Sequence, residues 1–265
     1  MDSIIAALPA TADGDLMLCL GAGVAYQRDM AYRSVSYDAA YLAKVDAYED
    51  TPIAEAVNAG RCELLQRHLP AGASVLDIGA GSGAFVRAAV ASGFAAKGFE
   101  VIAAAAVRLR VADLYADCEP GRFDAVSAWD VVEHLEDPGA LLATVPGFLF
   151  ASLPVFASLH RIRESRHYRP GEHLTYWTAG GFVAWAEGHG FQLLEQSAHE
   201  TEAGRDSIGA FAFRRALPGC AQLLLPHERL VILIARAATI AAAGRNSLSR
   251  WVLHLARSPN RARQR

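Results

Sequence analysis

The stretch from Ser74 to Glu100 constrains the fold of this chain more than any other part of the sequence. It opens with a short apolar run, Val75 to Ile78, which is too short for a helix and predicts a buried parallel strand. Glycines follow in a G-x-G-x-G spacing, which lets the backbone turn sharply and approach a ligand closely. Helix formers and a second short strand then lead to the acidic Glu100, so the stretch predicts the strand–loop–helix–strand unit of a nucleotide-binding α/β protein.

Asp77, inside the first strand, discriminates among the ligands that use such a unit. A phosphate-binding loop requires a lysine after its last glycine, and none follows Gly83. A dinucleotide loop prefers glycine where this chain has Ala84, although alanine is sometimes tolerated there. A carboxylate at the loop entrance disfavours a pyrophosphate and suits an ammonium group, such as the one that S-adenosylmethionine carries besides its sulfonium and ribose diol. The residues therefore favour S-adenosylmethionine, with an ordinary glycine-rich turn of another doubly wound protein as the alternative.

The segment V-L-D-I-G-A-G-S-G resembles the first motif of class I S-adenosylmethionine-dependent methyltransferases. The resemblance implies a Rossmann-like α/β fold, with a seven-stranded, mostly parallel sheet, an antiparallel last strand and helices on both faces. It also implies a cofactor site formed by Asp77, Gly79, Ala80, Gly81, Gly83, Glu100, Asp113 and Trp129. For Asp113 two roles stay open, which are binding of the adenine amino group and capping of a turn.

Hydrophobic periodicity and turn residues predict the remaining elements of this domain. The further strands are expected at residues 110–113, 123–128, 148–153, 191–195 and 208–213. The helices are expected at residues 53–68, 84–92, 101–109, 136–145 and 178–189, the first of them with Thr51 as its N-cap. The segment R-P-G-E-H-L-T-Y-W-T, which precedes the last of these helices, resembles uncharacterised bacterial and phage-borne methyltransferase-domain proteins.

Three regions are predicted along the chain. Residues 1–69 form a largely helical cover segment, residues 70–215 the cofactor-binding methyltransferase domain, and residues 216–265 a basic helical extension. In the extension we expect two apolar helices with arginines on one side, at 223–243 and 247–256. Such helices lie on a membrane surface, bind a partner or pack on their own domain, and the sequence leaves these three alternatives open.

Composition limits the partners and the location of the protein. The 265 residues are 52% apolar and 20% charged, with a net charge of −3, which makes a nucleic-acid partner unlikely. The four cysteines lie far apart and form no C-x-x-C pair, so we predict neither a zinc site nor a disulfide framework, and no metal. The N-terminus lacks the pattern of a signal peptide, and this predicts a cytoplasmic protein. The oligomeric state is not predicted.

Candidate catalytic residues follow the fourth and fifth strands, because ligands bind at the carboxyl ends of parallel strands. An oxygen or nitrogen acceptor needs a base, and imidazoles titrate near neutrality, so His134 and His173 are the first candidates. Asp130 and Glu133 come next. The E-H-L motif around His134 is common in this group whatever the substrate, so His134 has the alternative role of shaping the site.

Polar and aromatic residues crowd the segment from 156 to 177, which is expected to bind the acceptor. Its candidate substrate ligands are Arg169, Glu172 and Tyr176. Upstream, Tyr37, Tyr41 and Arg61 are candidates for contacting the cofactor carboxylate or for closing a lid, with core aromatics and a surface arginine as the alternative.

These observations predict an S-adenosylmethionine-dependent methyltransferase that acts on a small molecule, with a sugar or glycoconjugate hydroxyl as the leading acceptor. One alternative is a cofactor-binding protein without catalysis, which acts on a membrane or a partner through its basic C-terminal helices. Another alternative is a methyltransferase that acts on RNA or protein.

Overall fold

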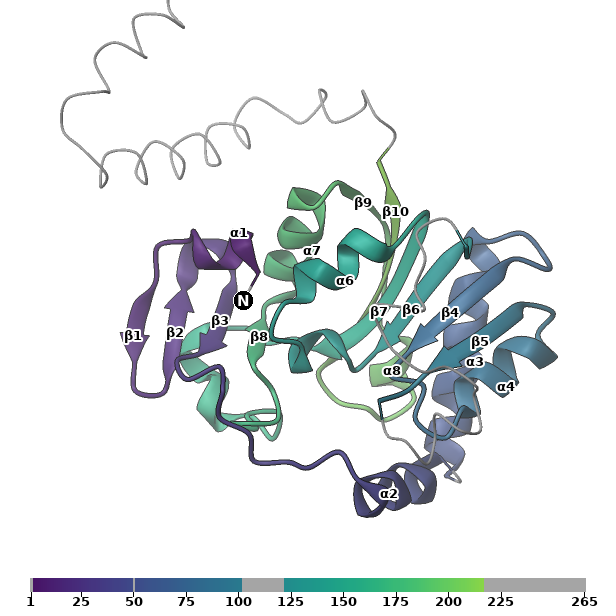
Figure 1. Ribbon diagram of the computed structural model, residues 1–265, viewed down its shortest axis with the longest axis horizontal. Helices are drawn as coiled ribbons and strands as arrows, with labels where there is room; N and C mark the ends of the chain where they lie inside the picture. Colours follow the sequence, from purple (N-terminus) through teal and green to yellow (C-terminus); the bar gives the residue numbers. More distant parts are fainter. Residues whose placement is uncertain (1, 50, 102–121, 217–265) are drawn as a thin grey trace, which may run out of the picture.

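The computed structural model describes residues 2–49, 51–101 and 122–216 of the chain (Figure 1). The predicted helix at 101–109, the strand at 110–113 with Asp113, and the helices at 223–243 and 247–256 lie outside these residues.

The main sheet contains six described strands in the order β5-β4-β6-β7-β10-β9 (Figure 1). The strands are β4 (Ser74–Ile78), β5 (Ala95–Phe99), β6 (Ala125–Trp129), β7 (Phe148–Pro154), β9 (Phe191–Ser197) and β10 (Ile208–Arg215). Neighbours from β5 to β7 pair in parallel, whereas β10 pairs antiparallel with both β7 and β9. The mostly parallel sheet with an antiparallel last strand is thereby confirmed, with one strand fewer than predicted among the described residues.

Helices cover both faces of the main sheet, as predicted. On one face α3 (Pro52–His68) and α4 (Ala84–Ala91) pack on a cluster that includes Val75 and Phe150. On the other face α6 (Pro138–Thr144) and α7 (Ala179–Gly188) pack on a larger cluster that includes Phe211. Because side chains alternate along a strand, β4 directs Val75 and Asp77 towards α3 and α4 and directs its other apolar residues to the opposite cluster.

Helix α3 begins where the sequence predicts. The Thr51 hydroxyl accepts a hydrogen bond from the Ala54 backbone N–H at 3.2 Å, and Pro52 occupies the first turn, where its missing N–H is harmless. Helix α2 (Ala39–Glu49) precedes it and lies over the glycine loop, since Val45 on α2 approaches Gly81.

The N-terminal cover segment is mainly helical in its second half only. Its first half contains a short helix, α1 (Ser3–Ala6), and three strands, β1 (Thr11–Asp13), β2 (Leu16–Cys19) and β3 (Val24–Gln27). These strands form an antiparallel sheet with β8 (Thr175–Trp177), which lies beside the main sheet (Figure 1). The first half folds into strands because a tight turn at Gly14, with φ of 59°, reverses the chain between β1 and β2.

Candidate active site

The glycine loop follows β4 and turns through left-handed backbone conformations. Gly79, Gly81 and Gly83 have φ values of 73°, 54° and 86°, which other residues rarely adopt. The backbone N–H groups of Gly79 and Ala80 donate to the Phe99 carbonyl oxygen at 2.9 and 3.0 Å, which ties the loop to the end of β5. The sequence therefore placed the loop correctly, and the structure adds that it is held rigidly.

Two acidic side chains flank this loop. Asp77 is 2% exposed and accepts a hydrogen bond from the Ser127 hydroxyl at 2.7 Å. Burial raises the pKa of Asp77 to about 7, although Ser127 and Arg61 act to lower it. Glu100 is also buried, and its Oε2 accepts a hydrogen bond from the Gly81 N–H at 2.8 Å. A ligand with a cationic group near Asp77 would stabilise the ionised carboxylate in this position.

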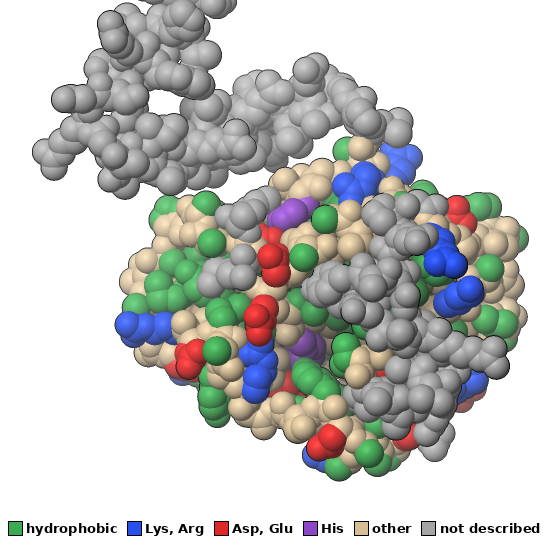
Figure 2. All heavy atoms as spheres, viewed as in Figure 1, with side chains coloured by type: hydrophobic (Ala, Val, Ile, Leu, Met, Phe, Trp, Pro, Cys, Tyr) green, Lys and Arg blue, Asp and Glu red, His purple; other side chains and the backbone are tan. Residues whose placement is uncertain are grey.

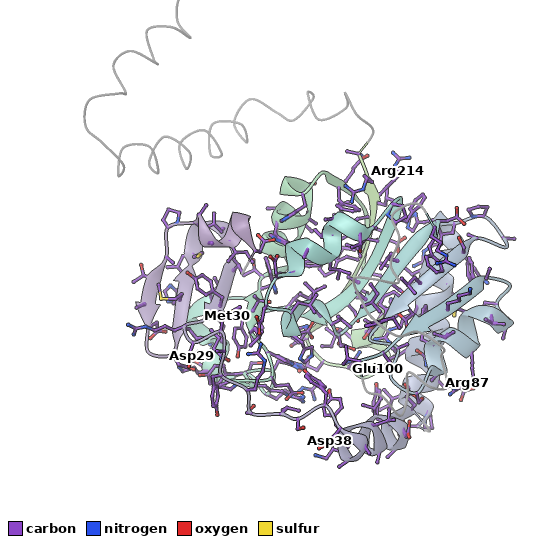
Figure 3. All side chains as sticks on the ribbon, in the orientation of Figure 1. Asp29, Met30, Asp38, Arg87, Glu100 and Arg214 are labelled. Carbon is purple, nitrogen blue, oxygen red and sulfur yellow. The ribbon has the colours of Figure 1, made fainter. Side chains whose placement is uncertain are left out.

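A cleft of about 880 Å³ opens beside the loop, at the carboxyl ends of the parallel strands. It is bounded by α2, by the end of β6 and by the segment that precedes β8. Figure 3 labels Glu100 between the sheet and α2. Figure 2 shows histidine, acidic and basic side chains together at the centre of this face. The following predicted site residues line the cleft: Asp77, Gly79, Ala80, Gly81, Glu100, Trp129, Asp130, His134, Arg169, Glu172 and His173.

A network of charged groups forms one wall of the cleft. The Arg61 guanidinium contacts Glu200 Oε1 at 2.8 Å and Asp130 Oδ2 at 3.2 Å, and it lies 4.8 Å from the ring centroid of Trp129. Arg205 pairs with the same two carboxylates. Burial by itself raises the pKa of Asp130, but the two guanidinium groups hold it below its usual value. Asp130 is thus an ionised partner of two arginines, an arrangement that opposes proton abstraction.

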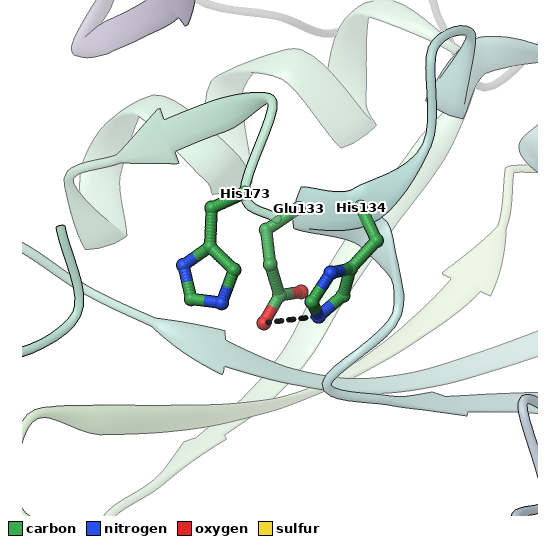
Figure 4. Close-up of side chains that lie close together, drawn as sticks. All are labelled: Glu133, His134 and His173. Carbon is green, nitrogen blue, oxygen red and sulfur yellow. Dashed lines mark ion pairs between the residues drawn. The ribbon is translucent and has the colours of Figure 1, made fainter. Parts of the chain in front are cut away.

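Three polar side chains gather at the other end of the cleft. Glu133 and His134 belong to the 3-10 helix η2 (Val132–His134), and His173 precedes β8. One imidazole nitrogen of each histidine and one carboxylate oxygen of Glu133 all lie within 4.8 Å of one another. Figure 4 shows the Glu133 carboxylate between the two imidazoles. Burial lowers the pKa of both histidines, that of His173 to about 3, so both imidazoles are neutral at physiological pH. Burial and the neighbouring Asp130 raise the pKa of Glu133 well above its usual value.

Of the predicted substrate ligands, two line the cleft and one does not. Arg169 and Glu172 pair at 3.2 Å within its wall. Tyr176 is only 1% exposed and packs among Leu16, Leu18 and other residues beneath the small sheet. The expectation that Tyr176 contacts substrate is therefore corrected, because this buried side chain packs in a separate apolar cluster and is not among the residues that line the cleft.

The structure also adds residues that the sequence did not single out. Arg205 and Glu200 complete the charged wall, and the Tyr37 hydroxyl lies 3.0 Å from His134 Nδ1. Tyr37 is one of the predicted lid residues, and only its contact with His134 is new. No sequence signal marks Arg205, because its partner Asp130 lies 75 residues away.

The strand order, the glycine loop at the carboxyl end of β4 and the two flanking acids define a Rossmann-like enzyme that binds a nucleoside cofactor. The family profile described as a methyltransferase domain matches residues 53–196, more than half of the chain. The chain is also 30% identical over 199 residues to a ubiquinone biosynthesis O-methyltransferase of Methylococcus capsulatus, a match that covers 59% of this chain and 84% of that protein. The protein belongs to this methyltransferase family, within the class I S-adenosylmethionine-dependent enzymes, and its cofactor is S-adenosylmethionine.

Solved structures with similar folds are more distant. A sarcosine dimethylglycine methyltransferase from Galdieria sulphuraria is 14% identical, with a TM-score of 0.49, over 60% of this chain and 85% of that chain. The 1,6-didemethyltoxoflavin-N1-methyltransferase of Burkholderia thailandensis is 16% identical, with a TM-score of 0.48, over 79% of this chain and 100% of that chain. Similarity at this level says nothing about the acceptor.

Proposed function

We propose that this methyltransferase transfers the methyl group to a hydroxyl oxygen of a small molecule, with a sugar or glycoconjugate as the leading acceptor. The observation that carries the proposal is the single cleft in which the glycine loop, its two acids and a group of uncharged imidazoles face one cavity. Its volume of about 880 Å³ is large enough for a cofactor with a small acceptor. The O-methyltransferase activity named for the Methylococcus capsulatus relative also supports an oxygen acceptor.

The cofactor end is proposed as follows. Asp77 faces the ammonium group and Glu100 accepts hydrogen bonds from the ribose hydroxyls, while Trp129 packs against the bound molecule. Backbone atoms of Gly79, Ala80, Gly81 and Gly83 form the loop that approaches it without interposed side chains. The cofactor supplies an activated methyl group, so the protein has to align the acceptor and let its proton leave.

At the acceptor end, Arg169 and Glu172 are proposed to orient the substrate, and His134 and His173 to lie next to its reacting oxygen. Asp130 is proposed to position Arg61 and Arg205 and not to act as the base. Within residues 2–49, 51–101 and 122–216, no helix is long and apolar enough to cross a membrane. The cytoplasmic location and the unlikely nucleic-acid partner stay predictions, as does membrane contact through the C-terminal helices.

Calorimetric titration of the purified full chain with S-adenosylmethionine, S-adenosylhomocysteine and NAD tests the cofactor site. We expect both sulfur compounds to bind and NAD not to bind. Glu100→Gln keeps an acceptor for the Gly81 N–H but loses the carboxylate, and should weaken binding by about 1–3 kcal/mol. Glu63→Gln, on the exposed side of α3, is the matched control and should leave the affinity unchanged. Equal affinity for the two variants would refute the role of Glu100.

Product formation then tests the acceptor. Incubation with methyl-labelled cofactor and a panel of sugars, nucleotide sugars, phenols and amines should label a hydroxyl compound. Labelling confined to amines, protein or RNA would refute the proposed acceptor while leaving the cofactor assignment intact.

A further inference from the structure

Glu133, His134 and His173 come from two segments that the backbone holds together. Their donor atoms lie within 4.8 Å of one another at the acceptor end of the cleft (Figure 4). The Leu174 N–H donates to the Glu133 carbonyl oxygen at 2.7 Å, so the residue after His173 is fixed against η2. The proximity of the three side chains is therefore built into the backbone.

Both imidazoles are oriented by backbone carbonyl groups. His134 Nδ1 lies 2.9 Å from the Glu172 carbonyl oxygen, and His173 Nδ1 lies 3.0 Å from that of His167. A carbonyl oxygen only accepts hydrogen bonds, so in each ring Nδ1 carries the proton and Nε2 carries the lone pair. Histidine ligands of metal ions are held in the same way, with the second ring nitrogen donating to a carbonyl or carboxylate.

The buried Glu133 carboxylate has one oxygen without a partner among the described residues. The side chain belongs to a residue only 2% exposed, and its Oε2 has no hydrogen-bond partner among the residues that the structure describes. Its Oε1 lies 3.9 Å from His134 Nε2, which is too far for a hydrogen bond. Buried polar atoms are nearly always paired, so this oxygen is open to a group that the described part of the chain does not supply.

We propose that Glu133, His134 and His173 bind a first-row divalent transition-metal cation, such as Mn²⁺, Co²⁺ or Zn²⁺, at the acceptor end of the cleft. Two imidazole nitrogens and one carboxylate suit these ions, whereas Mg²⁺ and Ca²⁺ prefer oxygen ligands only. Bonds of about 2.0–2.2 Å would draw the three groups slightly closer together than they lie now. Arg169, the cationic group nearby, is itself paired with Glu172. The prediction of no metal rested on the lack of a C-x-x-C pair, and these three ligands contain no cysteine.

Three protein ligands leave coordination positions open for the substrate. On the proposed function, the acceptor is then an alcohol that binds the ion through its reacting hydroxyl and a neighbouring oxygen, as a vicinal diol of a sugar does. The ion makes the bound hydroxyl more acidic, and its proton is released to solvent. The oxygen forms a bond to the methyl carbon while the carbon–sulfur bond breaks, and the electron pair of that bond stays on sulfur.

Direct metal titration tests the site without reference to activity. The full chain is treated with a chelator, and Co²⁺ alone is then added while binding is followed by calorimetry and by visible absorption. We expect one ion per chain, and absorption bands that indicate nitrogen ligation. Glu133→Gln, which keeps the shape of the side chain, and His173→Ala should each weaken binding by at least about tenfold. His160→Ala, at an exposed histidine, is the matched control and should bind as the wild type does.

Absence of Co²⁺ binding, or equal binding by wild type and Glu133→Gln, would overturn the metal site. Titration of the same samples with S-adenosylmethionine separates the two proposals. Cofactor binding without Co²⁺ binding refutes the metal site alone, and it also shows that a variant is folded. Co²⁺ binding without cofactor binding refutes the proposed function while the metal site stands.

Discussion

Replacing Asp77 with asparagine should stabilise the protein without cofactor while weakening cofactor binding. The carboxylate is buried between the main sheet and α3, and the Ser127 hydroxyl is its hydrogen-bond donor at 2.7 Å. Burial raises its pKa from 3.8 to about 7. Asparagine fills the same space, still accepts from Ser127 and carries no charge, so it removes the desolvation penalty of the ionised form.

The sign and size of the stability difference between Asp77→Asn and the wild type follow from proton linkage. Between pH 3.8 and about 7 the folded protein retains the Asp77 proton, whereas the unfolded chain has released it. The stability of the wild type therefore falls as the pH rises through this range, by about 1.4 kcal/mol per pH unit and about 4 kcal/mol in all. The stability of the variant does not fall in this way, because asparagine does not titrate. The difference in stability should grow by about 2 kcal/mol between pH 5.5 and pH 8.

Urea unfolding of both proteins at these two pH values, without cofactor, measures the difference. Asp206→Asn, at an exposed side chain, is the control and should show no such growth. Binding should change in the opposite direction, since the lost charge weakens S-adenosylmethionine binding by about 1–3 kcal/mol. A stability difference that is the same at both pH values would refute the argument that Asp77 is held with a raised pKa.

Two further variants test the loop and the charged wall. Gly79→Ala places a Cβ 2.5 Å from Val131 Cγ2 at a φ of 73°, so we expect a loss of about 1–3 kcal/mol in stability and weaker cofactor binding in calorimetry; unchanged values would show that the loop tolerates a side chain. Arg61→Met leaves the buried Glu200 carboxylate and the half-buried Asp130 carboxylate with fewer partners and should lower the free energy of unfolding by about 3–5 kcal/mol in urea titrations. The exposed Arg161→Met is its control, and similar losses in both would contradict the role of burial.

Local patterns were sufficient for the described strands of the main sheet, for the start of α3 and for the cofactor loop. The run Val75 to Ile78, the three glycines and Glu100 were assigned from the sequence, because strand length, glycine backbone freedom and the strand–loop–helix unit are encoded by neighbouring residues. The N-cap at Thr51 was found for the same reason.

The pairing of strands into the small sheet β1-β2-β3-β8 was not predicted, because these strands are short and one of them is distant in the sequence. Val24 in β3 pairs with Trp177 in β8, and no local pattern indicates a partner 153 residues away. The Asp13-Gly14 dipeptide was the one signal that could have indicated the hairpin. The prediction for Tyr176 was wrong for a similar reason, because no local pattern shows that its short strand is fully buried in a second sheet.

The sequence by itself determined the class of enzyme, since the glycine loop and its two acids are contiguous or nearly so and their chemistry selects the cofactor. Only the tertiary structure decided what surrounds the acceptor. Asp130 changed from a candidate base to a partner of Arg61 and Arg205, which come from elements far away in the chain. Likewise, His173 meets Glu133 because backbone pairing folds one segment onto another, and such long-range packing depends on the whole core and not on any local run of residues.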